Sequence, residues 1–278
     1  MKIIQITDTH LSPTKTHFND NWAPLAHFIE SEKPDLVVHT GDLSLDGADT
    51  VDDLTFAKDL LSELTMPVLV VPGNHDVGHD GGPQPVNAER LERWRTIVGP
   101  DCWSHDRDGW RLIGLNSLVF GVHPQEEAKQ LAWLEETLAT AGDRQIAMFA
   151  HQPLFVDGAD EGDSGYWGIK PAPRRTLFDL IAAHNVKLYA NGHLHRAWTG
   201  THEKTALVWG PSSAFIIDTL ERDMPGERWV GAVVHELGKT VSSTIMRVSG
   251  MSAHVIDDVI DEVYPREKFA AESSEAAE

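Results

Sequence analysis

Short apolar runs alternate with amphipathic helical patterns along most of this 278-residue chain. The apolar runs are rich in Val, Ile or Leu and span residues 2–7, 35–40, 67–71, 110–115, 145–150 and 186–190. The helical patterns between them span residues 22–32, 51–64, 88–98, 126–139 and 174–184. Continuous apolar runs suit strands that are covered on both faces. Because these strands alternate with helices, the sequence predicts an α/β fold.

The pattern changes in the last quarter of the chain. Residues 206–209, 228–236 and 240–247 resemble strands without helices between them, and we expect an antiparallel group that completes the fold. No repeat or linker interrupts the pattern, so residues 1–255 are predicted to form one domain. Residues 256–278 are predicted to be an acidic C-terminal tail, partly disordered or helical, because acidic residues dominate it and its last part is mainly Ala, Glu, Ser and Lys.

The chain is strongly acidic, with 43 Asp and Glu against 23 Lys and Arg and a formal net charge of −20. This balance argues against a surface for a nucleic-acid duplex, which needs clustered cations. A small anionic substrate stays possible, because a bound metal can invert the local field. The acidic tail is interpreted as a solvated face, and contact between copies in a homo-oligomer is the alternative.

Neither a membrane segment nor a secretory signal is predicted. No apolar run approaches the roughly 18–20 residues of a transmembrane helix. The first apolar run is too short, and charged too early, for a signal peptide. Cys102 is the single cysteine, so an intrachain disulfide is impossible. We therefore expect a cytoplasmic location by default.

Polar side chains follow five of the six predicted strands within about four residues. They are Asp8 and His10, Asp42, Asn74 with His75 and Asp76, His151, and His193 with His195. Open α/β sheets bind ligands at the carboxyl ends of their strands. The sequence therefore predicts that these groups gather at one edge of the molecule.

The residue types indicate a metal site. Imidazole and carboxylate together bind first-row metals such as Mn, Fe, Co and Zn, and the absence of thiolates argues against a structural zinc site. Four His, two Asp and one Asn exceed the needs of one ion, so they suit two ions that share a bridging carboxylate. Two ions about 4 Å apart can clamp both oxygens of a phosphoryl displacement.

The five motifs together resemble those of the calcineurin-like metallophosphoesterases. The series is Asp8-x-His10, Gly41-Asp42, Gly73-Asn74-His75-Asp76, His151 and Gly192-His193-x-His195, in family order. The resemblance implies a four-layer α/β/β/α sandwich and two divalent transition-metal ions, Mn, Fe or Zn. It implies that Asp8, His10 and His195 hold one ion, that Asn74, His151 and His193 hold the other, and that Asp42 bridges them. His75 would be the catalytic residue that faces the leaving group while a metal-bridging hydroxide attacks phosphorus.

The resemblance also narrows the substrate class. The chain lacks the Gly-Asn-His-Glu motif and the Arg after Gly-Asp that mark the protein phosphatases, and it is too short for the 5′-nucleotidase branch. It is most similar to the small bacterial phosphodiesterases that act on cyclic nucleotides, glycerophosphodiesters or phospholipid headgroups. We expect a phosphodiesterase acting on a small or lipid-derived substrate. A phosphomonoesterase and a non-catalytic interaction module of the same fold are the alternatives, although such modules lack ligands and none is missing here.

Other residues carry weaker hypotheses, each beside a structural interpretation. Asp76 could orient a neighbouring histidine or serve a turn or helix cap, Asp46 could support His75 by a hydrogen bond, and His39 is interpreted as a buried, hydrogen-bonded core residue. Trp94 and Trp133 are interpreted as core residues. The residues that could border the cleft or touch substrate are His79, His123, Arg196, Trp198, Tyr166 and Trp167, the last two from a long loop at 157–168 that could form a lid.

Overall fold

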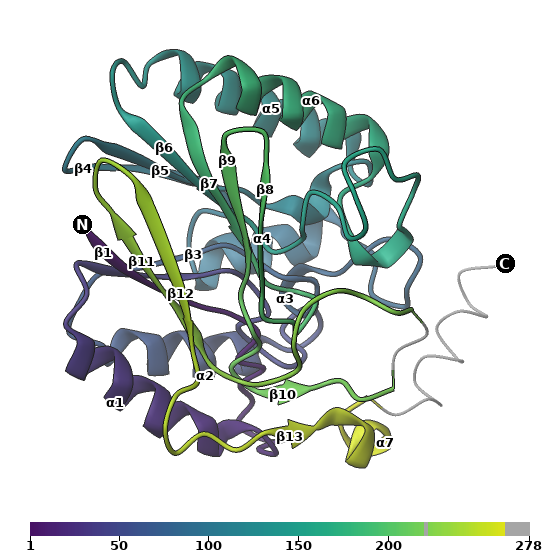
Figure 1. Ribbon diagram of the computed structural model, residues 1–278. Helices are drawn as coiled ribbons and strands as arrows, with labels where there is room; N and C mark the ends of the chain where they lie inside the picture. Colours follow the sequence, from purple (N-terminus) through teal and green to yellow (C-terminus); the bar gives the residue numbers. More distant parts are fainter. Residues whose placement is uncertain (220–221, 265–278) are drawn as a thin grey trace, which may run out of the picture.

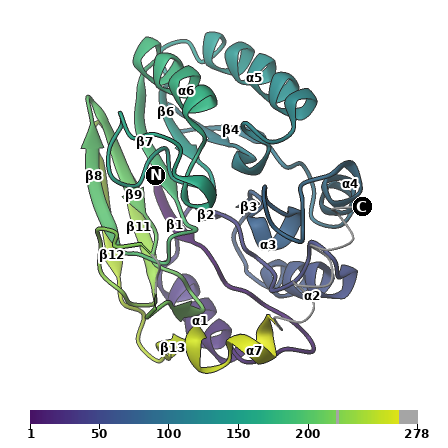
Figure 2. The ribbon, with the colours of Figure 1, turned by 90° about the vertical axis from the view of Figure 1, so that its right-hand side faces the viewer.

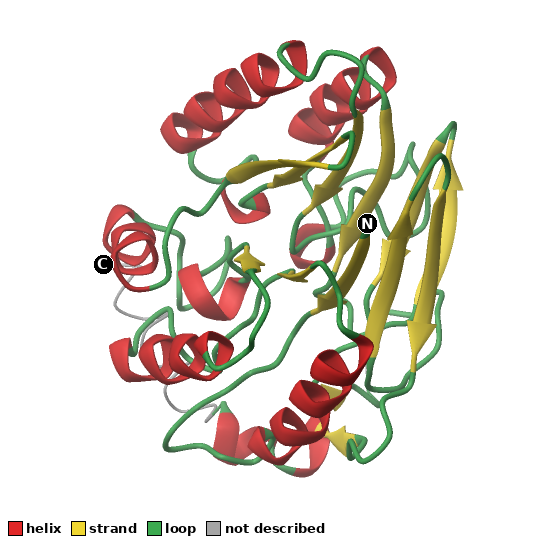
Figure 3. Cartoon of the chain, turned by 90° about the vertical axis from the view of Figure 1, so that its left-hand side faces the viewer, coloured by secondary structure: helices red, strands yellow, loops and turns green. Residues whose placement is uncertain are grey.

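Two β-sheets pack face to face at the centre of the molecule, and helices cover the outer face of each (Figures 1 and 3). The computed structural model describes residues 1–219 and 222–264. Each of the two sheets is mixed, with parallel strands inside and antiparallel strands at one or both edges.

The first sheet has five strands in the order β12-β11-β1-β2-β3. The strands β1 (Lys2–Ile6), β2 (Leu36–His39) and β3 (Val68–Val70) are parallel. A hairpin of β11 (Ala232–Leu237) and β12 (Val241–Met246) continues the sheet antiparallel to β1. The carboxyl ends of β1 and β2 therefore lie side by side.

The second sheet has six strands in the order β4-β5-β6-β7-β9-β8. Four strands are parallel: β5 (Trp110–Gly114), β6 (Gln145–Phe149), β7 (Val186–Asn191) and β9 (Thr205–Trp209). The edge strands β4 (Trp103–Arg107) and β8 (Trp198–His202) are antiparallel to their neighbours.

Helices form the two outer layers (Figure 2). The first sheet packs against α1 (Trp22–Glu32), α2 (Val51–Ser62) and α4 (Ala88–Ile97) through one apolar cluster. The second sheet packs against α5 (Pro124–Ala139) and α6 (Pro171–Ala183), which each begin with a proline, the residue that suits a first helical turn. A third cluster, which includes Val38 of β2 and Phe149 of β6, joins the two sheets. This confirms the predicted four-layer α/β/β/α fold in a single domain.

The prediction of an antiparallel group of strands after residue 205 was wrong in one respect. The run at 206–209 is β9, which pairs parallel with β7 in the second sheet, whereas β11 and β12 belong to the first. The sequence interpretation missed β8, which turns the chain back so that β9 runs in the direction of β7. Both β8 and β4 alternate between half-buried and exposed residues, as edge strands do, and so lack a continuous apolar run.

The C-terminal segment returns to the strand ends. Short strands β10 (Phe215–Ile216) and β13 (His254–Val255) pair in parallel, and a 3-10 turn (Ile256–Asp258) and the short helix α7 (Ile260–Val263) follow. Ile256 and Val263 are buried although the predicted tail begins at residue 256. The last part of that predicted tail, residues 265–278, lies outside the described residues. Among the residues that the structure describes, no helix is long and apolar enough to span a bilayer.

The remaining helical segments lie in connections. They are two 3-10 turns in the first half of the chain, Asn19–Asn21 and Ser117–Val119, a third at Gly165–Trp167 in the 157–168 loop, and the one-turn helix α3 (Asn74–Val77) that follows β3.

Candidate binuclear metal site

The predicted ligands at the ends of β1, β2 and β7 share an unusual backbone conformation. Asp8, His10, Asp42, His193 and His195 have positive φ angles of 52°, 43°, 51°, 72° and 51°. Non-glycine residues rarely occupy this left-handed region, and such strain concentrates at functional sites. The conformation turns each side chain sharply away from its strand and into the space between the strand ends.

Two of the motif glycines are required by the close approach of these loops. A Cβ atom at Gly73 would collide with the backbone nitrogen of Asp42, and one at Gly192 would collide with the hydroxyl of Thr7. The loops after β1, β2, β3 and β7 can therefore meet only where a side chain is absent.

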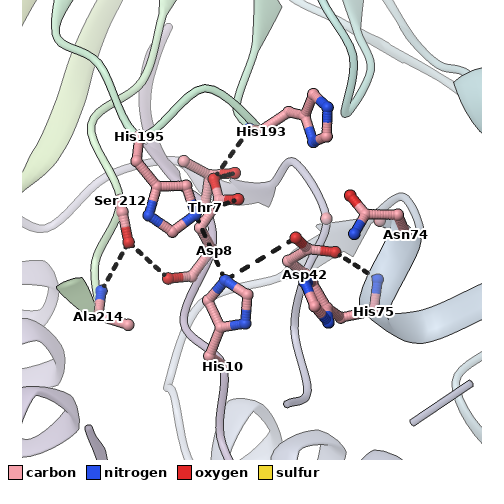
Figure 4. A network of polar contacts seen from close by, with 12 residues as sticks. Thr7, Asp8, His10, Asp42, Asn74, His75, His193, His195, Ser212 and Ala214 are labelled. Atoms are coloured by element: carbon pink, nitrogen blue, oxygen red, sulfur yellow. Dashed lines mark hydrogen bonds and ion pairs between the residues drawn. The ribbon is translucent and has the colours of Figure 1, made fainter. Parts of the chain in front are cut away.

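Asp8, His10 and His195 form the first group of candidate ligands. Their ligand atoms lie within 4.8 Å of one another, and all three residues are buried. His195 Nε2 lies 3.2 Å from Asp8 Oδ1 and 3.4 Å from His10 Nε2 (Figure 4). Two imidazole nitrogens and a carboxylate oxygen thus lie close together.

Asp42, His151 and His193 form the second group, again within 4.8 Å. His151 Nε2 lies 3.2 Å from His193 Nδ1 and 3.0 Å from the amide oxygen of Asn74. Asn74 thus lies beside the second group, where its amide oxygen adds a fourth candidate ligand atom.

Asp42 lies between the two groups. Its Oδ2 atom is 3.3 Å from His151 Nε2 and 3.8 Å from His10 Nε2, so one oxygen faces both sides. Its Oδ1 atom accepts a hydrogen bond of 2.8 Å from the backbone N–H of His75 (Figure 4). This second contact fixes the carboxylate plane and leaves Oδ2 for a bridging role.

Hydrogen bonds to backbone carbonyls orient three of the imidazoles. His151 Nδ1 lies 2.8 Å from Thr40 O, His195 Nδ1 lies 3.0 Å from Phe215 O, and His193 Nε2 lies 2.9 Å from Tyr166 O. In each case the other ring nitrogen faces the candidate site. Metal-binding histidines characteristically make such an outer hydrogen bond, which fixes the tautomer.

The donor set fits two divalent transition-metal ions. Among the described residues, buried Asp8 Oδ1 accepts no hydrogen bond and faces only His195 Nε2 at 3.2 Å, while Oδ2 accepts bonds from the Thr7 hydroxyl at 2.6 Å and the His193 N–H at 3.1 Å. A buried carboxylate oxygen without a donor is costly unless a cation faces it. The neighbouring imidazole nitrogens are the second ligand type that such ions prefer.

The electrostatics of the site favour ionised carboxylates. Burial opposes ionisation of Asp8 and Asp42, but the facing imidazoles of His195 and His151 outweigh it and hold both pKa values below the usual range. Burial also lowers the pKa of His193, to about 3, whereas at His151 the carboxylates of Asp42 and Asp8 and the Thr40 carbonyl together outweigh burial and raise the pKa to about 9. A bound cation would take the place of that proton, because a ligating imidazole must be neutral.

The carboxylate of Asp76 links the loop after β2 to the loop after β3 by hydrogen bonds. It accepts hydrogen bonds from the backbone N–H groups of Leu43, Ser44 and Gly73 and from the Ser44 hydroxyl, at 2.6–3.1 Å. Of the two roles considered from the sequence, the structure shows the turn role. Asp46 accepts a bond from Gln84 at 2.7 Å.

His39 contacts the loop that follows β1. It is fully buried, with Nε2 2.9 Å from the Thr9 hydroxyl, which itself donates to Leu43 O. This confirms His39 as a buried, hydrogen-bonded residue. Trp94 is likewise confirmed as core, and Trp133, a residue of α5, is partly buried against the apolar cluster of the second sheet.

A cavity of about 270 Å³ opens directly onto the candidate ligands. His75 lines it together with His10, Asp42 and both histidines of the last motif. The loop residues Tyr166 and Trp167, suggested as a lid, also line it, and the Tyr166 hydroxyl accepts a 3.1 Å hydrogen bond from the Asn74 amide.

Other residues singled out from the sequence lie away from this cavity. Trp198 packs on Trp209 with ring centroids 4.3 Å apart, and neither it nor Arg196 lines the cavity. His79 lines a separate cavity of about 470 Å³ that shares Tyr166 with the first. His123 lies directly before α5.

Sequence interpretation missed Phe215 and Tyr264, which both line the 270 Å³ cavity. The Phe215 ring lies 4.7 Å from that of His10 and 4.5 Å from that of His195. The local sequence of neither residue carries a chemical motif, and only the return of the C-terminal segment brings Tyr264 to the site.

Two mixed sheets between helical layers, with clustered buried histidines and aspartates at the strand ends, define a metallophosphoesterase with a candidate binuclear site. Residues 1–197 match the model of the calcineurin-like phosphoesterase family. The chain belongs to this family.

Individual relatives differ in what their names state. The 3′,5′-cyclic adenosine monophosphate phosphodiesterase CpdA of Escherichia coli is 32% identical over 270 residues, which cover 90% of each protein. The human serine/threonine-protein phosphatase CPPED1 is 32% identical over 171 residues, which cover 59% of this chain and only 52% of that relative. Among solved structures, GAP50 of Plasmodium has a TM-score of 0.64 at 17% identity over 98% of this chain and 94% of its own, a likeness of fold.

Proposed function

We propose that this protein is a hydrolase that cleaves phosphodiester bonds with two divalent transition-metal ions, Mn, Fe or Zn. Asp8, His10 and His195 would hold one ion, and Asn74, His151 and His193 the other, with Asp42 Oδ2 shared between them. When bound, two such ions neutralise charge on the phosphoryl oxygens and make a water molecule more acidic.

His75 is the proposed catalytic residue. Its ring lines the same cavity as the candidate ligands, 4.9 Å from the ring of His10, and its backbone N–H holds Asp42. The Nδ1 atom of His75 is buried without a hydrogen-bond partner among the described residues. From this position an imidazole N–H can donate its proton to the departing ester oxygen as the phosphorus–oxygen bond breaks.

The cavity lining is the observation that favours a diester over a monoester. Among the described residues, no Lys or Arg lines the 270 Å³ cavity. A phosphomonoester carries a second negative charge, for which enzymes generally provide cationic donors. A diester carries one charge, and its second ester group needs an uncharged surface, which this cavity offers.

The phosphomonoesterase is the second candidate, and it is supported by the named activity of the human relative. Activity on bis-p-nitrophenyl phosphate and on p-nitrophenyl phosphate, after reconstitution with Mn, Fe or Zn in turn, separates the two. We expect faster turnover of the diester with at least one metal. A higher kcat/KM on the monoester with every metal would contradict the proposal.

A second panel addresses the natural substrate. Cyclic nucleotides, glycerophosphodiesters and phosphatidylcholine are the three classes that the family resemblance leaves open. Each should be tested with the metal that gives the highest rate on the chromogenic diester, with Asp42→Ala as the control for contaminating activity and His75→Ala as the test of the catalytic residue. Equal rates for wild type and His75→Ala would remove His75 from its proposed role.

A further inference from the structure

One side of the cavity at the candidate metal site is a continuous apolar surface. Four of the candidate ligands and His75 line the cavity, and five residues from two distant segments form what we call the apolar wall: Phe215, Ile217, Ile256, Ile260 and Tyr264. None of these five side chains carries a formal charge at neutral pH. A substrate group that reaches from the phosphorus toward this side therefore meets only hydrocarbon, aromatic rings and one phenol hydroxyl.

The apolar wall is held in place by its own packing. Phe215 and Ile256 belong to a buried cluster that also contains Phe18 and Val263, and Ile217, Ile260 and Tyr264 pack against it. The pairing of β10 with β13 joins the two segments. The Lys15 ammonium donates a 2.6 Å hydrogen bond to Val263 O at the end of α7.

The size and lining of the cavity suit an aromatic ring. An engineered apolar cavity of about 150 Å³ is large enough to bind benzene. The 270 Å³ here can therefore take one ring together with a phosphoryl group. The rings of Phe215, Tyr264 and His75 line the same space, and aromatic side chains favour stacked or edge-on contacts with another ring.

We propose that the apolar wall binds an aromatic ester group of the substrate, so that the protein selects phosphodiesters that carry a flat apolar ring close to the phosphorus. This rests on the proposed function and names its substrate class. Diesters whose groups near the phosphorus are small and polar, such as glycerol, would leave the wall exposed to water. Burial of a ring against this surface stabilises the complex in proportion to the apolar area removed from water.

Binding of two stable phosphonates tests the inference without turnover. Calorimetric titration of the Mn-loaded protein with phenylphosphonate and with methylphosphonate compares a ring with a methyl group on the same phosphorus. We expect phenylphosphonate to bind at least about tenfold more tightly, which equals about 1.4 kcal/mol. Equal affinities, or no binding of phenylphosphonate, would overturn the inference.

Variants in both segments of the apolar wall test whether the wall causes the preference for phenylphosphonate. Ile217→Ser and Ile260→Ser, made separately, should each reduce the preference for phenylphosphonate to about threefold or less, whereas Val259→Ser should leave it unchanged. Val259 packs in the same cluster beside Ile260 but does not line the cavity, so it controls for loss of packing. The inference is contradicted if both wall variants keep the preference for phenylphosphonate. It is also contradicted if Val259→Ser abolishes that preference as strongly as the wall variants do.

Turnover separates this inference from the proposed function. The wall variants should lower kcat/KM for phenyl p-nitrophenyl phosphate by a larger factor than for glycerophosphocholine. A protein that prefers phenylphosphonate but hydrolyses no diester would refute the proposed function and leave the wall established. If the wild type hydrolyses diesters but the wall variants lose kcat/KM equally on both substrates, only the inference about the apolar wall is refuted.

Discussion

The phenol ring of Tyr264 stacks on the imidazole of His75, with ring centroids 4.8 Å apart and planes inclined by 28°. The Tyr264 hydroxyl lies 3.5 Å from His75 Nε2 and 3.3 Å from His10 Nδ1, and it donates to Leu45 O at 3.4 Å. A residue from the end of the described chain thus contacts one proposed catalytic group and one candidate ligand.

Replacement of Tyr264 separates the ring from the hydroxyl. Tyr264→Phe keeps the stacking and should lower kcat about fivefold, the equivalent of about 1 kcal/mol of hydrogen bonding, with little change in KM for a substrate without a ring. Tyr264→Ala should lower kcat further, because the imidazole of His75 then loses its stacked neighbour. Steady-state kinetics on glycerophosphocholine measure both effects. A Tyr264→Ala protein with the kcat of wild type would show that the stacking does not position His75.

Removal of the bridging oxygen should disturb both metal positions. Asp42→Asn replaces one carboxylate oxygen with an amide nitrogen, which cannot ligate a cation, and removes a negative charge that faces His151 and His10. We expect the bound metal, measured by elemental analysis after dialysis, to fall from two ions per chain to one or fewer. Asp53→Asn is the matched control, because Asp53 is buried and bonded to Ser12 but belongs to none of the candidate ligand groups. Two retained ions in Asp42→Asn would contradict the bridging role.

The hydroxyl of Tyr166 orients the Asn74 amide, so its loss should weaken metal binding at the second position. Tyr166→Phe removes the 3.1 Å hydrogen bond from the Asn74 amide and leaves the ring that contacts His193. Losses of about tenfold in metal affinity follow when such outer contacts are removed. Competition with a chelator measures the affinity of each ion. Tyr189→Phe, which removes a buried hydroxyl bonded to Gln152 O, is the control and should leave both affinities unchanged.

Buried His235, which is not a candidate metal ligand, should make stability depend on pH. It lies between Gln5 Oε1 and the Ser243 hydroxyl, at 3.0 Å and 2.8 Å, and burial lowers its pKa from 6.5 to about 3. The unfolded chain therefore binds a proton that the folded protein rejects between pH 6.5 and about 3. Folding loses stability as the pH falls through this range, by at most about 1.4 kcal/mol per pH unit from this one group.

The comparison of wild type with His235→Gln isolates this contribution. Urea denaturation at pH 7 and pH 5 gives the free energy of unfolding of each protein. The wild type should lose about 1–2 kcal/mol more than the variant between the two pH values. An identical loss in both would mean that His235 titrates in the folded protein as it does in the unfolded one.

The sequence was sufficient for the parts of the fold that have a local cause. Apolar runs predicted β1, β2, β5, β6 and β7 close to their observed bounds, because a strand buried on both faces must be apolar at nearly every position. The edge strands β4 and β8 escaped prediction because their outer residues face water and are polar. The partner of β9 also could not be foreseen, since pairing depends on which strand lies alongside and not on the apolar run itself.

The sequence by itself also determined which chemical groups follow the strands, because position along the chain fixes what each strand end delivers. Only the tertiary structure decided that Asp42 Oδ2 faces both His151 and His10, since those three residues meet through packing of separate sheets and loops. It likewise placed Phe215 and Tyr264 against the site. Their contribution depends on distances between segments far apart in the chain, and no local pattern of residues encodes such a distance.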